Sequence, residues 1–241
     1  MVAVILTRPQ GSVEQTAAVY QQAGFDVFLA PCFDIQTNSS VQTKWLHTPA
    51  DVWVILSVHA LQHALLIDPD LCPETHTKVI AVGPAVVNAW QQHFNHPIHS
   101  HPNMNSEGVI ELIKQENPRA VKILTTGGGR DLLRSYCMQQ RISYSQINTY
   151  ERRPLVIENK AVNKLFQQAK PPVLTATSVG ILQHFMSQLD ADNAAKIKTS
   201  PLVAGSQRIQ QAAQDMGFNH IHVAEDPSDV AMCEAVQSLN R

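Results

Sequence analysis

Small polar residues follow six short apolar runs in this sequence, and each stands directly before a stretch with helical periodicity. The segments are Thr7-Arg8-Pro9, Ser57, Gly83, Thr125 to Arg130, Thr177-Ser178 and Gly205-Ser206. The first amides of a helix lack internal partners and carry a partial positive charge, so they can bind carboxylates. Any single turn is better explained by ordinary helix capping. Six together favour a binding site for a ligand with several carboxylates.

Arginine side chains could reinforce such a site, because a guanidinium pairs with a carboxylate through two hydrogen bonds. The candidates near the turns are Arg130, Arg134, Arg152, Arg153 and Arg208, although a single arginine is more often a solvated surface residue. The run Gly127-Gly128-Gly129-Arg130 resembles a phosphate loop only loosely, since the lysine of the GxxxxGK[ST] pattern is missing. A nucleotide site is therefore not favoured.

Four histidines, His93, His96, His99 and His101, lie close together in the sequence. Pro97 and Pro102 interrupt the segment, and no helical pair of histidines is supported by a nearby carboxylate. We expect a polar loop there and no metal site. No Ser-His-Asp spacing or G-x-S-x-G motif is present either.

The bulk composition is that of a globular protein without a basic excess, so an anionic ligand would have to be held by a few local charges or by backbone amides. The 241 residues carry a formal net charge of -2, with 44% hydrophobic and 16% charged residues. Nucleic acid is therefore an unfavoured partner. No signal sequence or membrane span is recognisable, and the four scattered cysteines fit reduced thiols, so we expect a cytoplasmic protein.

The apolar runs predict an α/β fold. They are β-branched and apolar on successive residues, as in parallel strands covered by helices on both faces. The runs are Val2–Leu6, Val27–Leu29, Val52–Leu56, Val79–Val82, Val121–Leu124, Val173–Leu174 and Leu202–Ala204. Helices are expected at Val13–Gln22, before Gly24, and at Gln207–Met216, before Gly217.

An internal repeat refines this prediction. Three kinds of strand-turn-helix segment each occur twice, in cyclic order. The pairs are Val4–Gly24 with Lys122–Ile142, Val52–Leu65 with Pro172–Phe185, and Val79–Phe94 with Leu202–Phe218. We therefore expect two similar lobes of parallel sheet flanked by helices, joined by a two-stranded linker. The expected first lobe is residues 1–32 with 155–241, the second is 38–146, and the linker strands are 33–37 and 147–154.

Tyr150 lies in the second expected crossing between the lobes, followed by Arg152, Arg153 and Pro154. A tyrosine there would face the cleft between the lobes, where ligands often bind. A packing aromatic at a domain joint is the alternative interpretation.

Seven segments, taken in order through nearly the whole chain, resemble the uroporphyrinogen-III synthase family. They are ILTRP (5–9), ILSVHAL (55–61), AVGPAVVNA (81–89), SEGVIELI (106–113), GGGRDLL (127–133), TYERRP (149–154) and GSQRIQQAAQDMGF (205–218). The family often has Arg-Gly before its glycine-rich turn, whereas this chain has Thr125-Thr126. The family often has Thr-Ser-x-Asn in the turn of the second lobe, whereas here Ser57 is followed by Val58 and His59.

The resemblance implies an enzyme that needs no cofactor and closes hydroxymethylbilane, a linear tetrapyrrole with eight carboxylates, to uroporphyrinogen III. Hydroxide leaves the ring-A hydroxymethyl group, ring D attacks the resulting electrophilic carbon through its substituted α-carbon, and a spiro intermediate fragments and recloses with ring D inverted. Tyr150 is the implied general acid. The implied substrate-binding residues are Arg8, Pro9, Ser57, Gly83, Ser106, Gly128, Gly129, Arg130, Arg152, Thr177, Ser178, Ser206 and Arg208.

The expected partners are this small-molecule substrate and, transiently, the preceding enzyme of the pathway, with no nucleic acid and no membrane; we expect a monomer. Three alternatives stay open from the residues. One is a two-lobed transferase acting on a nucleotide sugar. The others are a two-lobed small-molecule receptor and a catalytically inactive paralogue.

Overall fold

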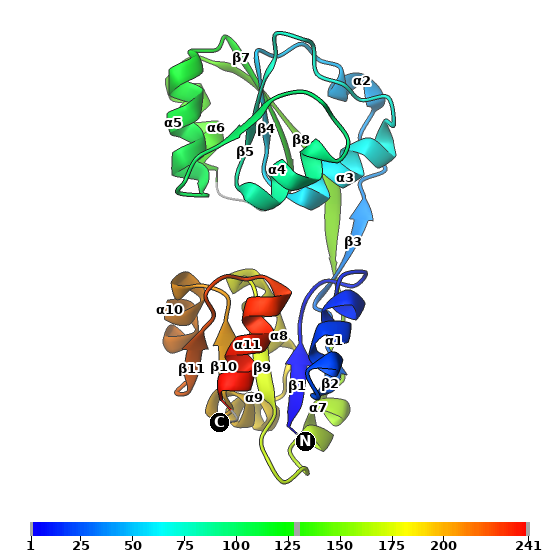
Figure 1. Cartoon of the computed structure of the whole chain (residues 1–241), viewed down its shortest axis with the longest axis vertical. Coiled ribbons are helices and arrows are strands. Elements are labelled where there is room, and N and C mark those ends of the chain that lie inside the picture. Colours follow the sequence, from blue (N-terminus) through cyan, green and yellow to red (C-terminus); the bar gives the residue numbers. More distant parts are fainter. Residues whose placement is uncertain (1, 128–130, 240–241) are drawn as a thin grey trace. The chain divides into compact units, whose positions relative to one another are not determined.

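The chain forms two compact units. The structure, a computed structural model, describes residues 2–127 and 131–239. Unit 1 comprises Met1–Asp34 and Arg153–Arg241, and unit 2 comprises Ile35–Arg152. The chain therefore leaves unit 1, builds unit 2 and returns to complete unit 1, as the colours of Figure 1 show.

The described part of unit 1 contains a five-stranded parallel sheet in the order β11-β10-β9-β1-β2. Its strands are β1 (Ala3–Leu6), β2 (Asp26–Leu29), β9 (Val173–Ala176), β10 (Leu202–Ala204) and β11 (Ile221–Val223). Its helices are α1 (Val13–Gln22), α7 (Asn159–Leu165), α8 (Val179–Gln188), α9 (Ala191–Thr199), α10 (Gln207–Asp215) and α11 (Asp229–Ser238).

The described part of unit 2 belongs to a six-stranded sheet in the order β3-β8-β7-β4-β5-β6. Its strands are β3 (Phe33–Thr37), β4 (Val52–Ile55), β5 (Lys78–Ala81), β6 (Ile98–Ser100), β7 (Ala120–Thr126) and β8 (Ser143–Pro154). Its helices are α2 (Thr43–Leu46), α3 (Val58–Ile67), α4 (Pro84–Gln91), α5 (Ser106–Glu116) and α6 (Leu132–Gln139).

The strands β3 and β8 are those that carry the chain between the units. The Asn38 amide donates to the Thr149 carbonyl and the Leu155 amide donates to the Cys32 carbonyl, both at 3.0 Å. Residue numbers rise along one strand as they fall along the other, so the two strands run antiparallel. They form a two-stranded connection, while residues 143–150 of β8 also pair parallel with β7.

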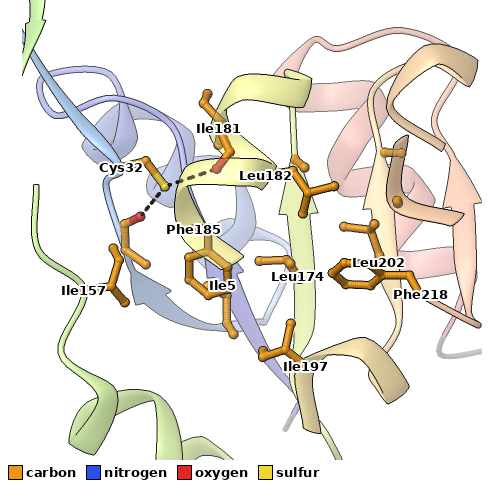
Figure 2. Close-up of a cluster of buried hydrophobic side chains, with 14 of the residues drawn as sticks. Ile5, Cys32, Ile157, Leu174, Ile181, Leu182, Phe185, Ile197, Leu202 and Phe218 are labelled. Atoms are coloured by element: carbon orange, nitrogen blue, oxygen red, sulfur yellow. Dashed lines mark hydrogen bonds between the residues drawn. The ribbon is translucent and has the colours of Figure 1, made fainter. Parts of the chain in front are cut away.

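The central strands of both sheets are buried on their two faces. In β1, Ala3 and Ile5 pack into one core cluster, whereas Val4 and Leu6 pack into another on the opposite face. Helices α8, α9 and α10 cover the first face and helices α1 and α11 cover the second. Figure 2 shows the first cluster, where Phe185 of α8 lies among strand side chains. The buried thiol of Cys32 donates to the carbonyls of Ala30 and Ile181 in the same cluster, and burial raises the pKa of Cys32 to about 12.

The repeat seen in the sequence corresponds to equivalent places in the two sheets. Strands β6, β5, β4, β7 and β8 of unit 2 follow one another as β11, β10, β9, β1 and β2 do in unit 1. Helices α1 and α10 are followed by Gly24 (φ +84°) and Gly217 (φ +90°), a left-handed conformation that glycine adopts at no steric cost. The predicted α/β fold with two parallel-sheet lobes, flanking helices and a two-stranded linker is confirmed.

Two strands were not predicted, and one expected loop is partly a strand. Strands β6 and β11 are short, and in each only the isoleucine is half-buried while the other two residues are exposed. An edge strand of this kind has no continuous apolar run. His99 lies within β6, so the prediction of a polar loop through the four histidines is wrong at this point. Along the described residues, no helix combines the length and apolar character needed to cross a membrane.

Candidate active site

Tyr150 of β8 is the centre of a polar cluster within unit 2. The ladder between β7 and β8 is irregular between Thr125 and Thr126, so that Thr126 pairs with Tyr150 after Thr125 pairs with Asn148. The Thr126 hydroxyl donates to the Tyr150 carbonyl at 2.8 Å and fixes the strand there. An irregularity of this kind re-aims a side chain. The Tyr150 ring is buried, with 1% of its surface exposed.

The Tyr150 hydroxyl lies between Ser57 and Arg152. The Ser57 Oγ is 3.2 Å from the phenol oxygen, and Arg152 Nη2 donates to that oxygen at 3.4 Å. Ser57 is also the N-cap of α3, where its Oγ accepts the Ala60 amide at 3.0 Å. The Ser57 hydroxyl thus caps the N-terminus of α3 and also contacts the phenol oxygen. The Arg152 side chain is exposed, so the phenol oxygen lies beside a group that reaches solvent.

Two histidines of α3, His59 and His63, flank the Tyr150 ring. They are four residues apart and therefore share one face of the helix. Their ring centroids lie 5.7 Å and 5.6 Å from that of Tyr150, and the His63 ring is nearly parallel to it, at 27°. His63 Nδ1 shares a hydrogen bond of 2.8 Å with Thr37 Oγ1 of β3.

Both imidazoles favour the neutral state. Burial lowers the pKa of His59, and the positive charges that His63 and Arg152 can carry lower it further. Burial alone lowers the pKa of His63. Desolvation disfavours a charged ring, and a neighbouring cation adds repulsion. Neutral imidazole can accept a proton as a base, so the cluster combines a phenol donor with two potential acceptors.

The other predicted binding residues of unit 2 lie at the carboxyl ends of its strands. Gly83 is the N-cap of α4, directly before Pro84, and is buried. Ser106 is the first residue of α5, whose N-cap is Asn105. Gly128, Gly129 and Arg130 lie outside the described residues.

The predicted binding residues of unit 1 occupy the matching strand ends, and their side chains are mostly half-buried. Arg8 is already paired: its Nε lies 2.8 Å from Asp229 Oδ1, and its Nη2 donates to the Pro227 carbonyl at 2.5 Å. The Pro9 carbonyl accepts the Ser12 and Val13 amides in the turn before α1.

The remaining two turns of unit 1 carry serine, threonine and arginine. Ser178 caps α8 by accepting the Ile181 amide at 3.2 Å, and Thr177 precedes it. Ser206 is the N-cap residue of α10 without a side-chain cap bond, and Arg208 is exposed in the first turn of that helix.

No metal centre is found in the described residues: they contain no group of three or more histidine, cysteine, aspartate or glutamate side chains that could hold an ion. His101 instead pairs with Glu111 at 2.9 Å.

Sequence reasoning named Tyr150, Ser57 and Arg152 but assigned no role to Thr37, His59 or His63. Ser57 and Tyr150 are 93 residues apart, so only the folded chain brings α3 against the end of β8. The available signal was the spacing of His59 and His63 on one helix face, directly after the serine of the turn.

Two parallel α/β units with a two-stranded connection, and a phenol held beside a helix N-terminus, define a two-domain α/β enzyme. Comparison with known proteins identifies its family. The family model described as uroporphyrinogen-III synthase HemD matches residues 14–234. The chain belongs to the uroporphyrinogen-III synthase family, and this membership supports the function expected from the sequence, the cyclisation of hydroxymethylbilane to uroporphyrinogen III.

Solved structures show the same fold. A mutant uroporphyrinogen III synthase from the extremely thermophilic bacterium Thermus thermophilus matches with a TM-score of 0.72 at 14% identity, over 99% of this chain and 98% of that one. Uroporphyrinogen-III synthetase from Helicobacter pylori matches with a TM-score of 0.63 at 14% identity, over 99% of this chain and 100% of that one. No curated protein matches the sequence.

Proposed function

We propose that this chain converts hydroxymethylbilane to uroporphyrinogen III, a lyase reaction that releases water, and that Tyr150 donates the proton that the leaving hydroxyl group needs. The observation that carries the assignment of Tyr150 is its phenol oxygen, held within 3.4 Å of both Ser57 Oγ and Arg152 Nη2 in a chain of this family. A guanidinium beside the oxygen stabilises the negative charge that remains after proton transfer.

The main contribution of the protein to this reaction is to position the two ends of the substrate. The pyrrole rings supply the electrons for both bond-forming steps, so the enzyme must hold ring A and ring D in one arrangement and exclude direct closure to the unrearranged isomer. A phenol near the leaving hydroxyl adds general acid assistance. The neutral hydrogen-bonded serine keeps the phenol in one orientation before substrate binds.

The substrate carboxylates are proposed to bind at the strand ends of both units. The N-termini of α3, α4, α5, α8 and α10 supply a partial positive charge there, and the side chains of Arg8, Arg152 and Arg208 add full charges. We also propose residues 33–37 and 147–154 as the linker strands of the substrate-binding enzyme. A cytoplasmic location, a monomeric state and transient contact with the preceding pathway enzyme stay predictions.

The direct test supplies the purified chain with hydroxymethylbilane, without added metal or nucleotide, and separates the product isomers. The proposal expects uroporphyrinogen III at a rate far above the reaction without protein. Type I product alone, formed at the uncatalysed rate, would contradict it and would favour a binding protein or an inactive paralogue.

A further inference from the structure

The overall reaction needs a proton acceptor as well as a donor. Loss of water removes the hydroxyl of the hydroxymethyl group and a hydrogen from the ring-D α-carbon at which the last bond forms. When that carbon–hydrogen bond breaks, its electron pair returns to the pyrrole ring, and the proton must pass to a base. After the first step Tyr150 has become a phenolate that must recover its proton.

The cluster in unit 2 contains a base with a free acceptor atom. His59 stands in the first turn of α3, and its ring is half-buried. Within the part of the chain that the structure describes, no residue forms a hydrogen bond with either ring nitrogen of His59. His63 differs, because its Nδ1 is engaged by Thr37 at 2.8 Å. His59 therefore keeps an imidazole nitrogen for a substrate.

The groups around His59 keep its ring neutral, and they place it near Tyr150, to which the proton must return. The titratable or charged groups facing it are His63 from α3 and Tyr150 and Arg152 from β8. Burial and the two potential cations lower the pKa of His59, so that the ring stays neutral near pH 7. Its ring centroid is 5.7 Å from that of Tyr150, a distance that one bridging water or a small ring movement can close.

We propose that His59 is a second catalytic residue, the base that accepts the proton from ring D during the final ring closure and returns it to the Tyr150 phenolate. This inference rests on the proposed function. The proton given by Tyr150 leaves with the hydroxyl as water, and the proton taken from ring D restores the phenol, so no external acid, base or oxidant is consumed.

The test compares the pH dependence of kcat in the wild type and in His59→Gln, an uncharged variant of similar size. In the wild type, kcat falls as the pH drops through the pKa of His59, because protonated imidazole cannot accept a proton. In His59→Gln that acid limb is absent, and kcat near pH 7 is lower by about 10²-fold. Substrate carrying deuterium at the free ring-D α-carbon shows a larger isotope effect with His59→Gln than with the wild type.

His63→Gln is the matched control, since it removes an imidazole from the same helix face. It keeps the acid limb and moves it to higher pH, because loss of a neighbouring positive charge raises the pKa of His59. His59→Ala with added imidazole gives a second measurement: the free base restores turnover in that variant and not in Tyr150→Phe.

The outcomes are distinguishable. A wild-type chain that forms no type III product overturns the proposed function. An active wild type whose His59→Gln variant retains the acid limb, the isotope effect and normal turnover overturns the role of His59 alone, and Tyr150 then recovers its proton directly from the substrate.

Discussion

The same scaffold occurs in both units, yet only unit 2 combines a phenol with two imidazoles at the equivalent place. The turn Ser178-Val179-Gly180 of unit 1 corresponds to Ser57-Val58-His59 of unit 2, and each serine caps the following helix. Glycine thus stands where unit 2 has an imidazole. The two turns therefore share their backbone arrangement and differ in their side chains.

The contrast extends to the aromatic residue beside each helix. The His184 ring of unit 1 packs at a tilt of 37° against Phe33, with ring centroids 4.7 Å apart, and shares a hydrogen bond of 3.1 Å with the Leu155 carbonyl. His63 of unit 2 stacks against Tyr150 and pairs with Thr37. Both units therefore have a histidine packed against an aromatic ring, but the phenylalanine ring of unit 1 has no hydroxyl that could donate a proton. The two units therefore share the helix and strand that support such a site, and they differ in the side chains that could react.

The largest expected effect follows from making unit 2 resemble unit 1 at this position. Tyr150→Phe removes the proton donor while the ring still packs, so kcat and kcat/KM fall together by roughly 10²–10⁴-fold and KM stays near its original value. Steady-state kinetics measure both constants. Phe33→Leu is the control in unit 1: it lowers the free energy of unfolding by about 1 kcal/mol and leaves kcat within about twofold. Normal turnover by a well-folded Tyr150→Phe would make Tyr150 a packing residue.

A second difference between the units concerns a buried charge. Lys122 begins the KILT segment of β7 where unit 1 has Val4 of VILT in β1. Only 1% of Lys122 is exposed; its Nζ lies 4.2 Å from the Trp53 ring centroid and donates to the Leu46 carbonyl. Burial lowers the pKa of Lys122 to about 8, and Glu74 opposes part of that shift.

This lysine predicts an unusual dependence of stability on pH. The unfolded chain binds more protons at Lys122 than the folded chain between about pH 8 and about pH 10.4, so stability rises with pH in that window, by up to about 3 kcal/mol. Lys122→Met, of similar volume, removes this gain while turnover is unchanged. Urea unfolding from pH 7 to pH 10.5 compares the two chains, and identical slopes would show that Lys122 keeps an ordinary pKa.

The arginines of the two units should also differ in their effect on binding. Arg8 of unit 1 already carries part of its charge against Asp229, whereas Arg152 of unit 2 is exposed beside the phenol. Arg152→Ala is expected to raise KM about tenfold, the effect of one charge-assisted hydrogen bond, and Arg8→Ala to raise it less. Arg8→Ala should also lower the free energy of unfolding by about 1 kcal/mol, through loss of the partly buried ion pair. A larger KM effect for Arg8 would reverse the assignment.

The smallest effect separates the two capping serines. Ser57→Ala and Ser178→Ala each lose an N-cap worth about 1 kcal/mol, so both lower Tm by similar amounts. Only Ser57→Ala also frees the Tyr150 hydroxyl, and its kcat should fall roughly 3–10-fold, the worth of one neutral hydrogen bond. Thermal unfolding and kinetics on the same samples provide the comparison. Equal kcat values for the two variants would remove Ser57 from the site.

The sequence predicts the fold well where burial determines residue type. Strands such as β1 and β4 are buried on both faces and read as unbroken apolar runs, whereas the edge strands β6 and β11 are largely exposed and leave no such pattern. The site is only partly predictable. A tyrosine at a crossing can be picked out, but the pairing of Arg8 with Asp229 depends on which distant turn packs beside which strand.

If the polar cluster of unit 2 carries the chemistry, removing its phenol changes the isomer ratio of the product. Wild type, Tyr150→Phe and Phe33→Leu are given the same hydroxymethylbilane, and uroporphyrinogens III and I are separated. We expect mainly type III from the wild type and from Phe33→Leu. With Tyr150→Phe, slow turnover lets the uncatalysed closure to type I dominate. If Tyr150→Phe forms type III as fast as the wild type, the phenol of unit 2 has no part in the reaction.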